Sequence, residues 1–327
     1  MKHFFKLALL AASVGLAATP SMAKPVIWDM ANEYNDTSIH AEGDKIFGEQ
    51  LGKLTKGEIK VVHHFGGSIG YKSKDQLDAV ADGALPLANT YVGPLGGIDP
   101  MFLLPSLPFL AKTPADARKL LDIARPSYDA VFKANNQKLL WASPWPASGF
   151  WAKKAIDSGD ALANLKIRTY DANSTITLKE AKAAPIQLSW ADVVPQLSTG
   201  GIDAVLTSAE GGTNAKFWEH LSHFTEVNYA LPLNMVHINL DTWASLDKAK
   251  QDAVLKAAKM AEEHVWAALE TRVAENYKAM KAAGVNVVTG VDPAFLASLA
   301  KAGEVARTEW LSKTGDKGRA ILDAYMK

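Results

Sequence analysis

Residues 164–173 read NLKIRTYDAN, residues 188–209 read LSWADVVPQLSTGGIDAVLTSA and residues 215–219 read AKFWE. An apolar run that ends at Arg168 predicts a short strand, and Ser189 is a suitable cap for a helix over Trp190–Ser198. The apolar run Ala204–Thr207 predicts the next strand. This order of strand, helix and strand indicates an α/β domain, in which helices cover both faces of a parallel or mixed sheet.

The N-terminal half of the chain shows the same alternation. Strands are predicted at Val26–Ala31, Ile59–His64 and Leu85–Thr90, with a capped helical segment between each strand and the next. Because 327 residues are too many for one small core, the chain suits two domains. The later run Asn234–Leu240 predicts a strand that returns to the first domain.

The sequence therefore predicts a two-domain α/β fold. We expect a signal peptide at residues 1–23, a first domain at 24–146 with about 235–263, and a second domain at 147–234 with about 264–327. The segment Ser245–Ala283 has helical periodicity and a length on the order of 55 Å. It is either one helix that lies across both domains or a pair of helices with an unmarked break.

The N-terminus has the three parts of a secretory signal. Lys2 and Lys6 supply positive charge, Leu7–Ala18 is an apolar core, and Ser21–Ala23 is a small-x-small cleavage site. The apolar core is shorter than the ~20 residues that a membrane-spanning helix needs. We therefore expect cleavage near Ala23 and a periplasmic protein that does not itself span the membrane.

Composition and motifs argue against several other functions. The chain has 35 basic and 35 acidic residues and no cysteine, so it has no excess of positive charge for nucleic acid and no thiol chemistry. It contains no nucleophile elbow, phosphate loop or His-Glu-x-x-His helix. His220 and His223 are more simply interpreted as solvated residues at a helix end than as a metal pair. The sequence predicts neither an enzyme nor a bound metal or other cofactor.

Arg168 is the first candidate for a ligand contact. A guanidinium presents a planar fork that binds a carboxylate through two parallel hydrogen bonds, and it stays charged at any working pH. Taken alone, an arginine after Leu-Lys-Ile is more often a surface or interdomain salt-bridge residue. The residues around it decide between these two interpretations.

Three segments around Arg168 carry a resemblance. They are NLKIR at 164–168, WADVVPQLSTGGID at 190–203 and KFWE at 216–219. Their order and spacing resemble the solute-binding subunits of tripartite ATP-independent periplasmic (TRAP) transporters. The pattern there is roughly G-L-K-[IL]-R, then [FW]-x-E-[VA]-[YF]-x-A-L-Q-T-G-x-[VI]-D-G, then K-F-[YW]-E. The similarity extends over the whole mature chain.

The resemblance implies a two-domain periplasmic binding protein of the class II-like type, with a hinge of crossing strands and a long helix that braces both domains. It also implies that Arg168 pairs with the carboxylate of a small organic acid, and that Trp190 and Thr207 lie at ligand-contacting positions. The implied partner is a TRAP-type membrane permease. The tail carries no decisive dimerisation signal, and we expect a monomer.

The chain departs from the family pattern at a second anion contact. Many members have Asn-Gly-Phe-Arg where this chain has Ser148–Trp151, so a tryptophan replaces an arginine. With Trp145, Trp190 and Tyr91, Trp151 is predicted to form an aromatic wall. Such a wall suits a flat apolar ligand, because ring stacking contributes about 0.5–1.5 kcal/mol per pair beyond area burial. The remaining candidate contact is Asn234, in the returning strand.

Three hypotheses about function follow. The favoured one is a receptor for a small organic monocarboxylate with an aromatic body. The second is a receptor for an aliphatic hydroxy- or oxo-acid, with the tryptophans packed in the domain cores. The third is a secreted α/β enzyme, against which the missing catalytic constellation argues. Asn32, Tyr34 and Tyr71 follow first-domain strands, where cleft loops are expected.

Overall fold

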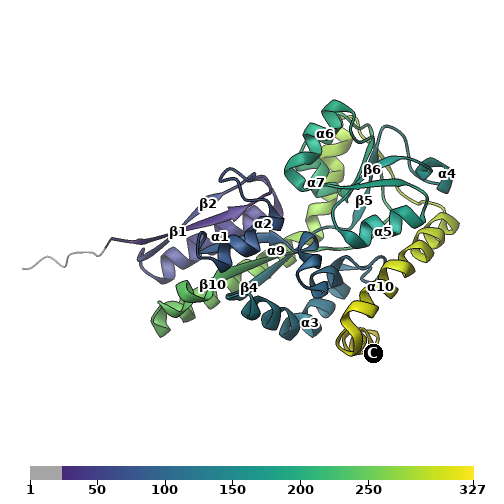
Figure 1. Cartoon of the computed structure of the whole chain (residues 1–327). Coiled ribbons are helices and arrows are strands. Elements are labelled where there is room, and N and C mark those ends of the chain that lie inside the picture. The colour runs from purple at the N-terminus through teal and green to yellow at the C-terminus, as the bar shows by residue number, and fades with distance from the viewer. Residues whose placement is uncertain (1–23) are drawn as a thin grey trace, which may run out of the picture.

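A computed structural model describes residues 24–327, so the predicted signal peptide lies outside the described residues. The described chain forms two α/β units, each built on its own sheet (Figure 1). None of the helices from residue 24 onward is both long enough and apolar enough to cross a bilayer. The predicted two-domain α/β class is confirmed.

The first sheet has the strand order β2-β1-β3-β10-β4. Its strands are β1 (Val26–Asn32), β2 (Ile59–His64), β3 (Leu87–Tyr91), β4 (Gln137–Pro144) and β10 (Leu233–Asn239). The first three pair in parallel, whereas β10 runs antiparallel to both β3 and β4. The accompanying helices are α1 (Ile39–Leu54), α2 (Ser73–Ala81), α3 (Pro114–Ala134), α8 (Leu240–Ala244) and the short turns η1 (Gly93–Gly97) and η2 (Pro100–Ser106). The predicted return of the chain to the first sheet through β10 is confirmed.

The second sheet has the strand order β11-β9-β5-β8-β6-β7. Its strands are β5 (Ser148–Ala152), β6 (Lys166–Thr169), β7 (Ala184–Gln187), β8 (Ala204–Ser208), β9 (His223–Thr225) and β11 (Asn286–Val288). The accompanying helices are α4 (Gly159–Leu162), α5 (Ala172–Glu180), α6 (Val193–Thr199), α7 (Ala209–Asn214), η3 (Trp190–Asp192) and η4 (Phe217–Glu219). Strand β6 pairs in parallel with both β7 and β8, which places Arg168 beside Val205 inside the sheet.

The two units are joined by chain segments that run side by side. Trp145 N–H donates to the Pro232 carbonyl at 2.9 Å, and Ser148 N–H donates to the Ala230 carbonyl at 2.9 Å. The connection from β4 to β5 therefore pairs with the segment that leads back into β10. This pairing is the hinge of crossing strands that the sequence resemblance implied.

Helix α9 (Lys248–Ala282) is one uninterrupted helix of 35 residues, rather than a pair with a break. Val254, Ala258 and Ala261 pack in the core of the first unit, whereas Met280 packs in the core of the second. The helix runs between the units in Figure 1. The interpretation of this segment as a helix spanning both units is correct.

Helix α10 (Pro293–Met326) differs from the expected domain boundary. It breaks at Gly315, whose φ of 58° and ψ of −135° are not helical. Before the break Leu299 packs in the second unit, but Trp310 and Tyr325 pack with α3 and β10 residues of the first. Figure 1 shows α10 passing along the second unit and ending near α3. The helix already packs on the first unit at Trp310, before the break, and continues there at Tyr325, so residues 264–327 do not all belong to the second unit.

Glu262 fastens α9 to the first unit. Its carboxylate accepts a hydrogen bond from Ala142 N–H of β4 at 3.0 Å, and it pairs with Arg125 and Arg118 of α3. Glu262 is largely buried, so these partners are not readily replaced by water. Removing the carboxylate would leave a buried N–H and a guanidinium without their acceptor.

We expect Glu262→Ala to lower the free energy of unfolding by about 2–4 kcal/mol, the usual cost of breaking a buried charged hydrogen-bond set. Urea denaturation followed by circular dichroism measures this change. The matched control is Glu263→Ala on the same helix, because the Glu263–Lys259 pair is solvent-exposed. Equal stabilities of the two variants would contradict the fastening role of Glu262.

Candidate functional site

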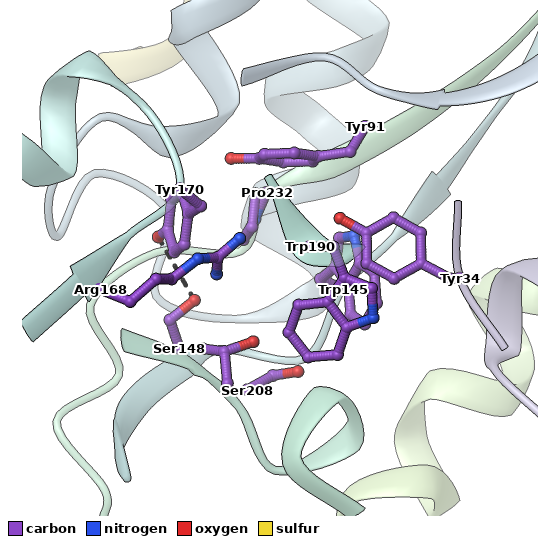
Figure 2. A pocket seen from close by; sticks show the side chains of 10 residues that line it. Tyr34, Tyr91, Trp145, Ser148, Arg168, Tyr170, Trp190, Ser208 and Pro232 are labelled. Atoms are coloured by element: carbon purple, nitrogen blue, oxygen red, sulfur yellow. Dashed lines mark hydrogen bonds between the residues drawn. The ribbon is translucent and has the colours of Figure 1, made fainter. Parts of the chain in front are cut away.

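A cavity lies between the two units. Its lining residues come from both: Tyr34, Tyr91, Trp145, Ser148, Arg168, Tyr170, Trp190, Thr207, Ser208 and Pro232. Figure 2 shows the guanidinium of Arg168 projecting among the aromatic side chains of this set. The structure thus brings together five of the predicted contacts, namely Arg168, Trp190, Thr207, Tyr91 and Trp145.

Arg168 is held in place by main-chain carbonyls. Its Nε donates to the Leu188 carbonyl at 3.2 Å, and its Nη1 donates to the Leu206 carbonyl at 3.4 Å. Leu206 lies on β8 and Leu188 directly follows β7, and these two strands flank β6. The sheet therefore fixes the direction of the side chain. Within residues 24–327 Nη2 has no hydrogen-bond partner, which leaves it available to a ligand.

Arg168 is only 3% exposed and forms no salt bridge with any carboxylate in the described part of the chain. Burial lowers the pKa of its guanidinium, while the neighbouring Tyr34, Tyr91 and Glu33 act in the opposite direction. A buried charge without a counter-ion costs several kcal/mol. The arrangement therefore favours an anion in the cavity, and a carboxylate fits the guanidinium fork.

Aromatic rings form most of the remaining surface. The ring centroids of Tyr34 and Trp145 lie 4.6 Å apart with the rings inclined at 65°, and those of Tyr34 and Trp190 lie 5.5 Å apart. The Arg168 Cζ lies 5.5 Å from the Trp190 ring and 5.8 Å from the Tyr170 ring, within cation–π range. The attraction of these two rings offsets part of the cost of burying the charge.

Hydroxyl groups supply the polar contacts of the cavity. Burial raises the pKa of Tyr34, Tyr91 and Tyr170 well above the usual value, so these phenols remain neutral donors. Tyr170 donates to Ser148 Oγ at 3.3 Å, while no partner within residues 24–327 occupies the hydroxyls of Tyr34 and Thr207. The cavity can therefore hold a carboxylate and a few further polar atoms.

Trp151 does not belong to this cavity, in contrast to the prediction of the aromatic wall. Its side chain is fully buried in the second unit, 5.7 Å from the Phe217 ring and 5.3 Å from the Phe224 ring. Side chains alternate along a strand, so Ser148, which lines the cavity, and Trp151 three residues later point to opposite faces of β5. The indole donates instead to the Ser208 carbonyl at 3.2 Å.

Asn234 is also not a lining residue. It is fully buried behind the cavity, where its Oδ1 accepts a hydrogen bond from the indole Nε1 of Trp145 at 2.8 Å. In contrast to its prediction as a ligand contact, Asn234 holds the lining side chain of Trp145 and does not itself line the cavity. Periodicity along β10 does not reveal this, because all of its residues are buried.

Tyr34, Tyr170, Ser148, Ser208 and Pro232 are lining residues that the sequence did not identify as contacts. The sequence predicts for Tyr34 only a position in a loop after a first-unit strand. Tyr170 lies two residues after Arg168, on the same side of the chain, and this spacing was an available signal. The other three lie on the crossing segments or at strand ends, whose convergence depends on the tertiary fold.

Carboxylates connect the two units beside the cavity. Glu33 of the first unit accepts hydrogen bonds from Ser73 N–H at 2.8 Å and from Ala191 N–H of the second unit at 3.0 Å. Asp192 forms a salt bridge with Lys72 at 2.8 Å across the same gap. Glu210 of the second unit accepts a hydrogen bond from Ile39 N–H, at the start of α1, at 3.0 Å. The units are thus closed over the cavity.

Two α/β units that close over a buried, uncompensated guanidinium define a two-domain receptor for a small anionic solute. The chain belongs to the bacterial extracellular solute-binding proteins of family 7 (DctP), whose sequence pattern matches residues 30–310. It is a TRAP-type solute-binding subunit, and not an enzyme. TRAP solute-binding proteins are periplasmic, and membership of this family implies that the chain has a permease partner.

Relatives and solved structures agree with this assignment. A marine metagenome TRAP solute-binding protein specific for pyroglutamate, from an unidentified microbe, is 31% identical with a TM-score of 0.89, over 93% of this chain and 99% of that one. DctP6 of Bordetella pertussis, a receptor that binds pyroglutamic acid, is 26% identical with a TM-score of 0.88, over 92% and 99%. The 2,3-diketo-L-gulonate-binding periplasmic protein of Escherichia coli K12 is 26% identical over 87% of each chain.

The packing of Trp151 yields a stability prediction. A Cβ added to Gly212 of α7 would lie 2.1 Å from Trp151 Cε2, so the fully buried indole would have to move. We expect Gly212→Ala to destabilise the protein by about 1–3 kcal/mol through overpacking. Thermal unfolding measures the loss, with Gly159→Ala as the control because a Cβ there meets nothing within 4 Å. Unchanged stability of Gly212→Ala would place the indole outside this core.

Proposed function

We propose that this chain is a periplasmic receptor for a compact organic monocarboxylate with a flat ring, such as pyroglutamate, which it delivers to a TRAP-type permease. The observation that carries the proposal is the buried guanidinium of Arg168, which faces aromatic rings and has no carboxylate partner among residues 24–327. The predicted signal peptide would direct export and be cleaved near Ala23.

The size and chemistry of the cavity favour a small ring. It is lined by ten residues, five of them aromatic, so the open space between them suits a compact ligand. Tyr34, Trp145 and Trp190 offer ring faces, whereas the polar groups other than Arg168 are mainly hydroxyls. A sugar acid would need a partner for each hydroxyl, because an unsatisfied buried polar group costs about 1–3 kcal/mol.

The relatives support a small ring acid without fixing its identity. Three of the similar structures bind pyroglutamate, a five-membered lactam with one carboxylate. An E. coli relative is named for an open-chain sugar acid, so ligands vary within the family. Because aromatic rings line the cavity, aromatic monocarboxylates are a second candidate class of ligand. An experiment has to separate the two classes.

We expect pyroglutamate to raise the melting temperature of the refolded, ligand-free protein in a thermal-shift assay. A ligand at a hundredfold excess over its dissociation constant adds about 2.7 kcal/mol of stability. Pyroglutamide, which keeps the ring and lacks the carboxylate, is the matched control and should have no effect. Benzoate, lactate and glucuronate complete the panel.

Each outcome of this assay has a separate meaning. Stabilisation by benzoate alone would replace the lactam by an aromatic acid. Stabilisation by lactate alone would remove the ring requirement, and stabilisation by glucuronate alone would replace the flat ring by a hydroxylated sugar ring. Equal stabilisation by pyroglutamate and pyroglutamide would contradict the carboxylate contact.

Substitution of Arg168 tests the carboxylate contact directly. A lysine keeps the charge but loses the planar fork and both carbonyl contacts that aim it. We expect Arg168→Lys to weaken binding of the stabilising acid about 10- to 100-fold, corresponding to about 1.4–2.8 kcal/mol, in isothermal titration calorimetry. Arg319→Lys on the exposed end of α10 is the control. An unchanged dissociation constant in Arg168→Lys would remove this residue from the site.

A further inference from the structure

A buried carboxylate lies behind the aromatic side of the cavity. Asp44, on α1, is fully buried, and no salt bridge to a described cation compensates its charge. Its Oδ2 accepts a hydrogen bond from Asn32 Nδ2 at 2.7 Å, and its Oδ1 accepts one from Asn89 Nδ2 at 2.7 Å. Each oxygen thus faces a side-chain amide.

Two hydrogen-bonded branches lead from these amides to the cavity. In the first, Asn89 Oδ1 accepts from Asn234 Nδ2 at 2.9 Å, and Asn234 Oδ1 accepts from the Trp145 indole at 2.8 Å. In the second, Asn32 Oδ1 accepts from the main-chain N–H of Tyr34 at 2.9 Å. Both branches therefore end at residues that line the cavity.

The direction of every hydrogen bond in the two branches is fixed by their ends. An indole N–H and a main-chain N–H can only donate, and an ionised carboxylate can only accept. Each asparagine between them must therefore turn its oxygen toward the cavity and its NH₂ toward Asp44. The ionised carboxylate is the one group that satisfies both branches at once.

We propose that Asp44 is a positioning residue of the ligand site, whose ionised carboxylate orients three buried asparagines and through them holds Trp145 and Tyr34 in place. This inference rests on the proposed function, because the two rings are taken to contact the ligand. A proton on Asp44 turns one oxygen into a donor that opposes an amide NH₂. The protonated oxygen is a weaker acceptor for its amide, and the new O–H faces only amide NH₂ donors unless the amides turn against their fixed ends.

Burial raises the pKa of Asp44 to about 7, while the hydrogen bonds from Asn32 and Asn89 and the charge of Lys45 act in the opposite direction. Asp44 therefore changes its charge near neutral pH. The carboxylate of pyroglutamate is ionised well below this range, since α-carboxyl groups have pKa values of about 3.5. A fall in affinity between about pH 8 and about pH 5.5 would thus come from the protein.

Other titratable groups lie on α1 and on the elements packed against it. On α1 itself they are His40, Glu42, Lys45, Glu49 and Lys53; on the neighbouring elements they include Glu33 after β1, His63 on β2, Glu210 on α7, and Glu262, His264 and Arg272 on α9. Burial lowers the pKa of His40 and lowers that of His63 to about 4, so neither gains a proton near pH 7. The carboxylate and cationic groups on the other elements have partners of their own, such as the Arg272–Glu42 and Arg125–Glu262 pairs. Removal of Asp44 separates its titration from that of these neighbours.

The first experiment needs no ligand. In ¹⁵N-tryptophan-labelled protein, the indole resonance of Trp145 is identified by its loss in Trp145→Phe. We expect this resonance to shift with a midpoint near the Asp44 pKa of about 7 in the unsubstituted protein, and to be insensitive to pH in Asp44→Asn. A fixed resonance in the unsubstituted protein, or the same titration in Asp44→Asn, overturns the proposal.

If Asp44→Asn does not fold, Asn89→Leu serves as the second variant. It keeps Asp44 and cuts the branch to Trp145, so the Trp145 resonance should lose its pH dependence although Asp44 still titrates. Retention of the titration in Asn89→Leu would show that the signal reaches Trp145 by another route and would overturn the proposal.

The second experiment measures pyroglutamate binding by calorimetry. We expect affinity to be about three- to tenfold weaker at about pH 5.5 than at about pH 8, the loss of one ring contact. Asp44→Asn should show the weaker affinity at both pH values. Equal affinities of the unsubstituted protein at the two pH values overturn the proposal. If pyroglutamate does not bind at either pH, the ligand assignment fails, and the Trp145 resonance still decides the role of Asp44.

Discussion

The uncompensated charge of Arg168 is the constraint on which the binding site depends. Main-chain carbonyls of Leu188 and Leu206 orient the guanidinium, but dipoles of this kind do not neutralise it. When the two units close, the side chain is almost wholly removed from water. Closure without an anion therefore buries a lone charge, whereas closure over a carboxylate buries a hydrogen-bonded ion pair. Charge compensation thus links ligand binding to the closed arrangement.

The two units contribute different parts of the site. The second supplies the charge through Arg168 and polar groups such as Thr207, whereas the first supplies Tyr34 and Tyr91. The second unit also supplies Trp190, whose ring packs against Tyr34 of the first unit. Neither unit alone encloses a ligand, so affinity depends on their relative placement. The crossing segments and α9 link the two units, and Trp145, Ser148 and Pro232 of the crossing segments also line the cavity.

The sequence was sufficient for what local patterns determine. Alternating strand and helix signals predicted the two sheets, the periodicity of Ser245–Ala283 allowed the single long helix, and the motif around Arg168 predicted its place in the site. The resemblance predicts Trp151 in the cavity because many family members have a ligand-contacting arginine at this position. The alternation of side chains along β5 instead turns Trp151 into the core. The kink at Gly315 and the contribution of Tyr34 depend on contacts between distant segments, which no local pattern encodes.

Ligand contact and domain closure occur at adjacent residues. Tyr34 and Trp190 face each other across the cavity, and their chain neighbours Glu33 and Ala191 share a hydrogen bond of 3.0 Å. A ligand that fixes the separation of the two rings therefore also fixes the distance between this carboxylate and the main-chain N–H. Because Glu33 accepts from a main-chain N–H, this hydrogen bond depends on the position of the second unit and not on the conformation of a side chain of that unit. The geometry around the ligand is in this way coupled to the relative placement of the two units.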